Sequence, residues 1–245
     1  KIKILDVGSG QGGYSLGALW ALKAIFPDKS IFVFAMDGNP NYLTDFDAIH
    51  NELFDRAQYT FFRSTHIVEI CGDCLNFPDS VIPHKFDLIL SSKFLNELYD
   101  EKQVEKNPYS YFIERCEELL NQDGFLIIND ITRSLSNDED GKPIAFVGDI
   151  MKCGIKMYLD NMGELKVCFP IPCSFYFPRC DFKFCSVFRK FDVQSKYRMK
   201  RNKEHVESHP AQITYLILSF EDTVDKVYEG YILAKRYPPE EKCLV

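Results

Sequence analysis

The sequence has 245 residues, of which 46% are hydrophobic and 14% aromatic, and this composition indicates a globular chain with a substantial core. The formal net charge of −7 argues against a generally basic surface for nucleic acids. No apolar run approaches the roughly 20 residues that cross a bilayer, and we therefore expect a soluble, intracellular protein without a membrane partner.

The chain opens with a candidate strand, Ile2–Asp6, and a candidate helix over Tyr14–Phe26. The turn between them contains Gly8, Gly10, Gly12 and Gly13. A strand, a glycine turn and a helix start form the place where an α/β sheet accepts a nucleotide-like ligand, because glycine lets the backbone come close and the first helical amides face the ligand. Since the sequence begins directly in this strand, we expect a further segment before Lys1.

The next apolar run, Ile31–Met36, ends at Asp37, where a carboxylate is placed to accept hydrogen bonds from two ribose hydroxyls. Apolar runs predict three more strands, and helical periodicity predicts two more helices. The strands are His66–Cys71, Phe86–Ser91 and Gly124–Ile131, and the helices are Asn41–Phe54 and Tyr109–Asn121. Right-handed crossovers then place helices on both faces of a mainly parallel sheet.

In the second half, the polar segment Ser134–Pro143 predicts a loop or linker, and a long helix is expected over Ile144–Asn161. Near the end, Ile213–Asp222 and Val227–Tyr237 predict an antiparallel hairpin with an acidic turn at Asp222–Asp225. The expected fold is a Rossmann-like α/β domain over residues 1–245, with a mainly parallel seven-stranded sheet completed by this C-terminal antiparallel hairpin. Residues 134–210 are expected to form an insertion or appendage.

Residues 1–132 contain four motifs in order: Asp6-Val-Gly8-Ser-Gly10-Gln-Gly12, the acid Asp37, the pair Gly72-Asp73, and Phe86-Asp87-Leu88-Ile89-Leu90 at the start of the fourth strand. These motifs resemble those of class I S-adenosylmethionine-dependent methyltransferases. The resemblance implies S-adenosylmethionine as the cofactor, with its amino-acid end on the glycine turn, its ribose on Asp37 and its adenine amino group near Asp73. The full expected cofactor set is Asp6, Gly8, Ser9, Gly10, Gly12, Asp37, Gly72, Asp73, Cys74 and Ser91.

A nicotinamide-dependent Rossmann enzyme is the alternative, because Gly8, Gly10 and Gly13 also fit the pattern G-x-G-x-x-G. Asp6, two residues before the first glycine, and the Gly72-Asp73 pair favour the methyltransferase.

Methyl transfer requires positioning and, where the acceptor carries a proton, a base. The candidate catalytic residues follow the fourth strand and are Ser92, Asn96 and Glu97, with Lys93, Asn129 and Asp130 nearby along the two strand ends. Glu97 is the candidate base, although it is equally consistent with a surface carboxylate. The chain lacks an Asn-Pro-Pro-Tyr or Pro-Cys signature after the fourth strand, which argues against an exocyclic base amine and against C5 of a pyrimidine as the acceptor.

Four cysteines lie close together, and four thiolates can hold zinc or an iron–sulfur cluster. The predicted metal ligands are Cys168, Cys173, Cys180 and Cys185. Their spacing lacks paired C-x2-C knuckles, and the alternative is that several are buried free cysteines.

The phrase Ser91–Leu98, the proline-cysteine segment and the strand Tyr215–Leu218 are similar to features of the mitochondrial small-ribosomal-subunit assembly methyltransferase-like family. That resemblance implies an iron–sulfur cluster on Cys173, Cys180 and Cys185, with Cys168 or Cys153 as the fourth ligand. The expected location of the protein is the cytoplasm or the mitochondrial matrix. The sequence departs from the family pattern: the usual histidine and tryptophan are absent, and Asn129-Asp130 replaces a glutamate-proline pair.

Residues 189–203 carry seven lysines and arginines, namely Arg189, Lys190, Lys196, Arg198, Lys200, Arg201 and Lys203. With Tyr197 among them, they can follow an RNA backbone and stack on a base, or they can form a solvated loop. The expected function is a methyltransferase with RNA, in particular ribosomal RNA or a ribosomal particle, as the acceptor. The alternatives are an inactive S-adenosylmethionine-binding assembly factor and a small-molecule methyltransferase.

Overall fold

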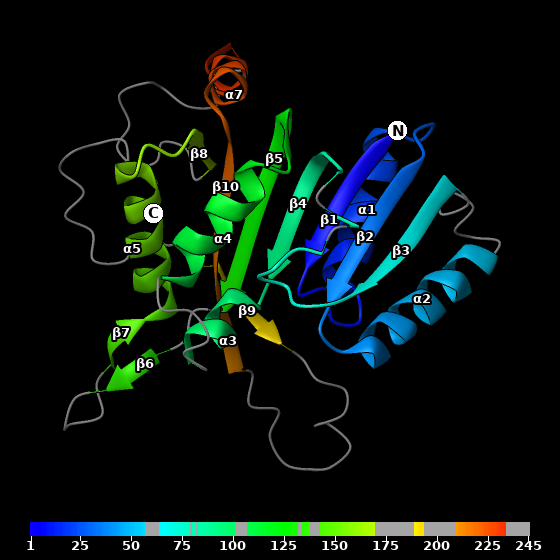
Figure 1. Ribbon diagram of the computed structural model, residues 1–245, viewed down its shortest axis with the longest axis horizontal. Helices are drawn as coiled ribbons and strands as arrows, with labels where there is room; N and C mark the ends of the chain where they lie inside the picture. Colours follow the sequence, from blue (N-terminus) through cyan, green and yellow to red (C-terminus); the bar gives the residue numbers. More distant parts are fainter. Residues whose placement is uncertain are drawn as a thin grey trace.

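The structure is a computed structural model that describes residues 1–56, 64–78, 80–81, 83–100, 107–131, 134–137, 143–169, 189–193 and 209–233. Its centre is a mixed sheet in the order β3-β2-β1-β4-β5-β10-β8 (Figure 1). The strands are β1 (Ile2–Val7), β2 (Ile31–Asp37), β3 (Thr65–Cys71), β4 (Phe86–Ser92), β5 (Leu120–Ile131), β8 (Leu165–Phe169) and β10 (His209–Phe220). An eighth strand, β9 (Arg189–Val193), pairs with β10.

Strands β1 to β5 are parallel to one another, whereas β10 runs antiparallel to β5, β8 and β9. This is the sheet of a class I methyltransferase fold, with seven strands on the main path and one antiparallel strand near the edge. The fold class predicted from the sequence is confirmed.

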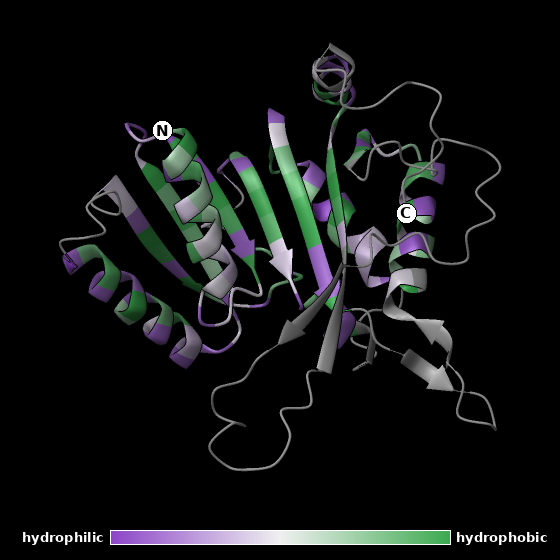
Figure 2. Ribbon diagram, turned by 180° about the vertical axis from the view of Figure 1, so that it is seen from behind, coloured by the Kyte–Doolittle hydropathy of each residue, from purple (hydrophilic) through white to green (hydrophobic). Residues whose placement is uncertain are grey.

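Helices cover the two faces of the sheet with separate apolar cores. Helices α1 (Gly13–Ile25) and α2 (Pro40–Asp55) lie on the face seen in Figure 2. Their buried side chains include Leu19 and Phe46. The other face carries α3 (Leu95–Asp100), α4 (Pro108–Glu117) and α5 (Val147–Asp160), which belong to the larger core. Residues 143–169, part of the predicted insertion, thus contribute α5 and β8 to this core and sheet.

Two helices begin at an Asn-Pro pair. The side chains of Asn39 and Asn107 accept hydrogen bonds from the amides two residues later, and a proline follows each at the first helical position. Proline fits there because its missing N–H has no helical partner to lose. The two helices therefore begin one residue earlier than predicted.

The predicted extension of the helix α4 to Asn121 was wrong. The helix ends at Glu117, and Leu120 already pairs with Phe86 in the sheet. The register between β4 and β5 shifts before Leu88, and a Cβ on Gly124 would lie 2.9 Å from the carbonyl oxygen of Asn121. The residues that were predicted as the end of the helix therefore form the irregular start of β5, where Gly124 leaves no room for a side chain.

The predicted loop at Ser134–Pro143 was also wrong in part. Its ends form a small antiparallel sheet of β6 (Ser134–Asn137) and β7 (Pro143–Phe146). Because β7 takes up residues 143–146, α5 begins at Val147 and not at Ile144.

The second strand of the predicted C-terminal hairpin was wrong as well, because Glu221–Leu233 form the helix α7. The less exposed residues of this segment recur with helical spacing: Thr223 and Val224 are buried, and Val227 and Tyr228 are half-buried. The acidic stretch read as a turn is the first helical turn, where Glu221 and Asp222 complement the helix dipole.

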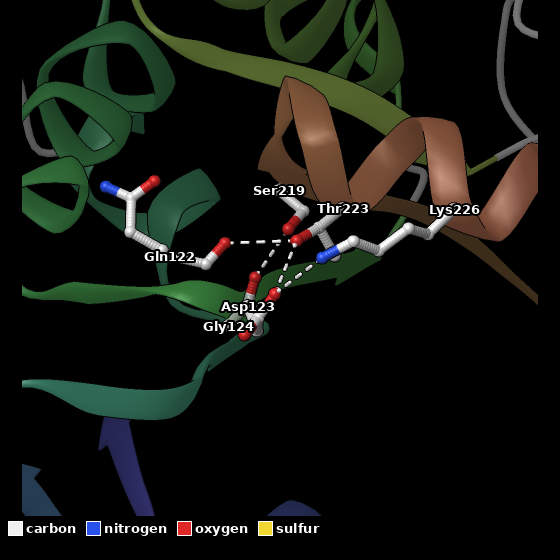
Figure 3. A network of polar contacts seen from close by, with 6 residues as sticks. All are labelled: Gln122, Asp123, Gly124, Ser219, Thr223 and Lys226. Atoms are coloured by element: carbon white, nitrogen blue, oxygen red, sulfur yellow. Dashed lines mark hydrogen bonds and ion pairs between the residues drawn. The ribbon is translucent and has the colours of Figure 1, made fainter.

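Helix α7 and the end of β10 are attached to the start of β5 by polar contacts (Figure 3). Ser219 Oγ donates to the carbonyl oxygen of Gly124 at 2.6 Å, and Thr223 Oγ1 donates to that of Gln122 at 3.1 Å. Lys226 Nζ lies 3.2 Å from the carboxylate of Asp123. Over the stretches that the structure describes, none of the helices is both long and apolar enough to span a bilayer.

Candidate functional site

A cavity of about 720 Å³ lies at the carboxyl ends of β1, β2, β4 and β5. In open α/β sheets this edge is where ligands bind. The lining residues are Asp6, Gly8, Ser9, Gly10, Gly13, Tyr14, Asp37, Gly38, Tyr42, Cys74, Ser92, Lys93, Phe94, Glu97 and Asn129. Eight residues predicted from the sequence as cofactor or catalytic residues are among them: Asp6, Gly8, Ser9, Gly10, Asp37, Cys74, Ser92 and Glu97.

The turn between β1 and α1 depends on glycine at three positions. Gly8, Gly10 and Gly12 have φ values of 71°, 52° and 77°, in the left-handed region that other residues rarely adopt. A Cβ on Gly8 would lie 2.4 Å from the Phe94 ring, and one on Gly12 would lie 2.1 Å from the Phe46 ring. A Cβ on Gly10 would meet no atom within 4 Å, so Gly10 leaves open space beside the cavity.

Asp6 is the most unusual group of the site, because only 1% of it is exposed. Its Oδ2 accepts a 2.6 Å hydrogen bond from Ser15 Oγ, whereas its Oδ1 is buried and has no partner among the described residues. Burial, with a smaller contribution from the negative charge of Asp37, raises the pKa of Asp6 to about 6. A buried oxygen without a donor is costly, and it indicates that a ligand with a donor or a positive charge belongs there.

Asp37, at the end of β2, is half-buried and bridges two backbone segments. Its Oδ2 accepts from the amide of Gly10 and its Oδ1 from the amide of Asn39, both at 2.8 Å. These bonds hold the carboxylate at the mouth of the glycine turn. Each oxygen retains a lone pair for a ligand hydroxyl.

The opposite wall comes from the ends of β4 and β5. Ser92 pairs with Asn129 in the sheet, and both line the cavity. Lys93 has φ 60°, and its amide donates to the carbonyl oxygen of Asn129 at 2.8 Å. A lysine in the left-handed region is strained, and such residues gather at functional sites.

Tyr14, in the first turn of α1, faces this wall. Burial, together with the nearby charge of Asp6, raises the pKa of the Tyr14 phenol, and the side chain of Asn129 lowers it in part. The cavity therefore brings hydroxyl, amide and carboxylate groups of three elements together.

The structure does not bring every predicted residue to the cavity. Asp73 is exposed, and its carboxylate accepts from the Leu75 amide and the Asn76 side chain, which lowers its pKa. The other predicted residues outside the lining are Gly12, Gly72, Ser91 and Asn96. Cys74 lines the cavity from the segment after β3, and burial raises its pKa to about 12, so it remains a thiol at neutral pH.

Residues missed as site residues are Gly13, Tyr14, Gly38, Tyr42 and Phe94. Tyr14 and Tyr42 belong to the first turns of α1 and α2, and each follows a strand end that the motifs identified. Their positions relative to the glycine turn and Asp37 were the signal available in the sequence.

The predicted metal ligands are only partly within the described structure. Cys168 is buried in β8, and burial raises its pKa to about 11. Cys173, Cys180 and Cys185 lie outside the described residues. Within the described ranges, no three His, Cys, Asp or Glu side chains are grouped so that they could hold a metal ion.

No protein-family model and no curated protein sequence matches the chain. Similar solved structures include a SAM-dependent methyltransferase from Methanosarcina mazei, with 13% identity over 88% of this chain and 91% of that chain and a TM-score of 0.49. An arsenic(III) S-adenosylmethionine methyltransferase from Chlamydomonas reinhardtii has 13% identity over 89% and 62%, with a TM-score of 0.48. An rRNA methylase from Streptococcus thermophilus has 12% identity over 90% and 87%, with a TM-score of 0.41.

Proposed function

We propose that this chain binds S-adenosylmethionine in the cavity and transfers its methyl group. The observation that carries the proposal is the unpartnered, buried Oδ1 of Asp6 beside the glycine turn. The cofactor carries an ammonium group and a sulfonium, and an isolated carboxylate oxygen suits such a cation. The open space at Gly10 and the free lone pairs of Asp37 suit the adenosyl part of the same ligand.

The sheet order supports this cofactor over a nicotinamide. In the classic dinucleotide-binding fold, the strands follow the order 3-2-1-4-5-6 in a mostly parallel sheet. Here the strand beside β5 is β10, which is antiparallel to it.

When bound, S-adenosylmethionine supplies an activated methyl group for in-line displacement by the acceptor. Asp6 and Asp37 would hold the ligand from one side of the cavity, and Ser92 and Asn129 would face it from the other. Glu97 is exposed at the cavity and is the candidate base for an acceptor proton.

For the acceptor we propose RNA, in particular ribosomal RNA or a ribosomal particle. Support comes from the position of β9, where the basic stretch begins. Strand β9 pairs with residues 209–213 of β10, and Ile213 pairs with Ile131 at the carboxyl end of β5. The basic stretch therefore starts at the same edge of the sheet as the cavity. Arg189 lies level with Ile131, two residues after Asn129, and β10 lies between them. Its remainder, 194–203, lies outside the described residues.

Titration calorimetry with S-adenosylmethionine and S-adenosylhomocysteine tests the cofactor. Asp37→Ala is expected to weaken binding by about 1 to 3 kcal/mol, the scale of a charge-assisted hydrogen bond. The matched control is Asp55→Ala, which removes an exposed carboxylate at the other end of α2. Equal binding by the wild type and Asp37→Ala would refute the assignment of the ribose to Asp37.

Transfer of a tritiated methyl group to RNA, protein and small-molecule fractions tests the acceptor. Label in RNA supports the proposal, and label in small molecules supports the small-molecule alternative. Cofactor binding without transfer to any fraction supports an assembly factor that lacks catalysis.

The zinc or iron–sulfur site on Cys168, Cys173, Cys180 and Cys185 is a separate proposal. It is tested by anaerobic purification followed by metal and sulfide analysis. A protein with neither metal nor sulfide would refute both the metal site and the ribosome-assembly resemblance that suggested it.

A further inference from the structure

Asp130 is a buried carboxylate next to the cavity that the proposed chemistry does not use. It follows Asn129 in β5, and because side chains alternate along a strand, the two residues point to opposite faces of the sheet. Asn129 lines the cavity, whereas Asp130 is 1% exposed and lies on the face of α3 and α4.

Three donors converge on the Asp130 carboxylate. Its Oδ2 accepts from the amide of Asn96 at 3.0 Å and from the hydroxyl of Tyr109 at 2.9 Å. Its Oδ1 accepts from the amide of Ile131 at 2.9 Å. Asp130 thereby joins β5 to the first turn of α3 and to α4.

Residues Ser92–Glu97, here called the β4–α3 wall, are held to β5 at two points beyond the sheet pairing of Ser92 with Asn129. The first is the Lys93 amide on the carbonyl oxygen of Asn129, and the second is the Asn96 amide on Asp130. Between these points Phe94 packs so closely on the glycine turn that a Cβ on Gly8 would overlap its ring. The strained backbone of Lys93 needs such attachments to persist.

We propose that Asp130, supported by Tyr109, is a positioning residue that fixes the β4–α3 wall against the reacting part of the bound cofactor. This inference rests on the proposed function. Ser92, Lys93, Phe94 and Glu97 of the wall line the cavity opposite Asp37, so a displaced wall affects contacts at the methyl group more than contacts at the ribose.

The test uses Tyr109→Phe, which removes one donor and keeps the buried ring, and Asp130→Asn as a second variant. The matched control is Tyr158→Phe. Tyr158 is also buried, and its hydroxyl bonds to the Glu117 carboxylate and the Leu165 amide in the larger core. Tyr158 lies outside the cavity lining but in the same core as Tyr109. A general weakening of that core is therefore expected in both tyrosine variants, whereas an effect on the cavity is expected only in Tyr109→Phe.

Binding of two ligands distinguishes contacts at the methyl position from contacts at the ribose. S-adenosylhomocysteine lacks the methyl group, and sinefungin carries an amine in its place that faces the acceptor. Tyr109→Phe and Asp130→Asn are expected to change the dissociation constant of S-adenosylhomocysteine less than about twofold and to raise that of sinefungin about fivefold, the scale of one hydrogen bond. Tyr158→Phe is expected to leave the ratio of the two constants unchanged.

Hydrogen exchange of the ligand-free protein gives an independent readout. Amides of residues 91–98 are expected to exchange faster in Tyr109→Phe and Asp130→Asn, and at the wild-type rate in Tyr158→Phe. An unchanged ratio of constants together with unchanged exchange in both variants would overturn the inference. If the wild type binds neither ligand, the proposed cofactor is wrong, and the exchange data alone decide whether Asp130 holds the wall.

Discussion

Asp6 links the ionisation of a single carboxyl to cofactor binding. Its pKa of about 6 means that it is charged at neutral pH and protonated in mild acid. Because only the charged form suits a cationic ligand, the affinity of the wild type for S-adenosylmethionine is expected to fall about tenfold per pH unit below about pH 6 and to level off above pH 7. Calorimetry from pH 5 to 8 measures this dependence.

Asp6→Asn is expected to bind more weakly at pH 7.5 and to lose this pH dependence, because the amide does not titrate. Asp28→Asn, which changes an exposed aspartate after α1, should follow the wild type. A wild-type affinity that is constant from pH 5 to 8 would contradict the role of Asp6.

Alanine substitutions at two glycines of the β1–α1 turn are expected to affect different properties. The change at Gly12 lowers stability, and the change at Gly10 mainly weakens ligand binding. Gly12→Ala places a methyl group on the Phe46 ring at φ 77°, and we expect a loss of about 3 kcal/mol in the free energy of unfolding. Gly10→Ala meets open space, so its backbone strain costs only about 1 kcal/mol, whereas the methyl group narrows the cavity. Urea unfolding and calorimetry compare the two variants, and equal losses of stability would refute this distinction.

The sequence identified the residues of the site whose roles follow from local pattern. Asp6, Asp37 and the glycines were predicted because a strand end and a turn determine where such residues lie. Asp130 was named with Asn129 as a candidate at the end of the fifth strand, but its positioning role could not be predicted, since its partners Asn96 and Tyr109 are distant in sequence. Asp73 was predicted from a local motif but does not line the cavity. Its carboxylate instead accepts hydrogen bonds from Leu75 and Asn76 in a local turn.

Helix α7 is held to the sheet by its first turn. Thr223→Val keeps the shape of the side chain but removes the donor to the Gln122 carbonyl, and it is expected to lower the free energy of unfolding by about 1 kcal/mol (Figure 3). Lys226→Ala breaks an ion pair whose side chains are 68% and 83% exposed, and it should cost less than about 0.5 kcal/mol. Denaturant unfolding measures both, and a larger loss for Lys226→Ala would contradict this ranking.

Long elements with strong periodicity could be predicted, and elements defined by tertiary pairing could not. The five parallel strands and α1, α2 and α4 were found within a few residues of their bounds. The strands β8 and β9 have five residues each and form only because β10 offers partners. The segment of α7 was predicted as a strand because its apolar residues fit the strand period as well as the helical period. Contact with β8 and β10 favours the helix.

The antiparallel β10 determines how the second half of the chain meets the first. It pairs with β5 over residues 213–218 and extends past the end of β5 at residues 209–212, and its residues 209–213 pair with β9. This pairing places residues 189–193 at the same edge of the sheet as the cavity, although they lie far from the glycine turn in sequence. The sequence suggested the basic stretch and the cavity separately, whereas the strand pairing shows that residues 189–193 share the cavity's edge of the sheet.

The two buried carboxyls next to the cavity also set how the stability of the whole molecule depends on pH. Burial raises the pKa of both Asp6 and Asp130 to about 6, whereas the unfolded chain titrates near 3.8. Between these values the folded state binds more protons than the unfolded state, so each carboxyl favours folding in mild acid and loses that contribution as the pH rises through 6.

From pH 4.5 to 7.5 the loss is about 2 kcal/mol for each group. Neither residue is among the charges that shift the other's pKa, so the two losses should add. Relative to Asp6→Asn/Asp130→Asn, the wild type is therefore expected to lose about 4 kcal/mol of unfolding free energy over this range, and each single variant about half of that. Urea unfolding of the ligand-free proteins at both pH values measures the difference. A wild type and a double variant with parallel pH profiles would mean that the two carboxyls titrate alike in the folded and unfolded states, and that burial does not raise their pKa.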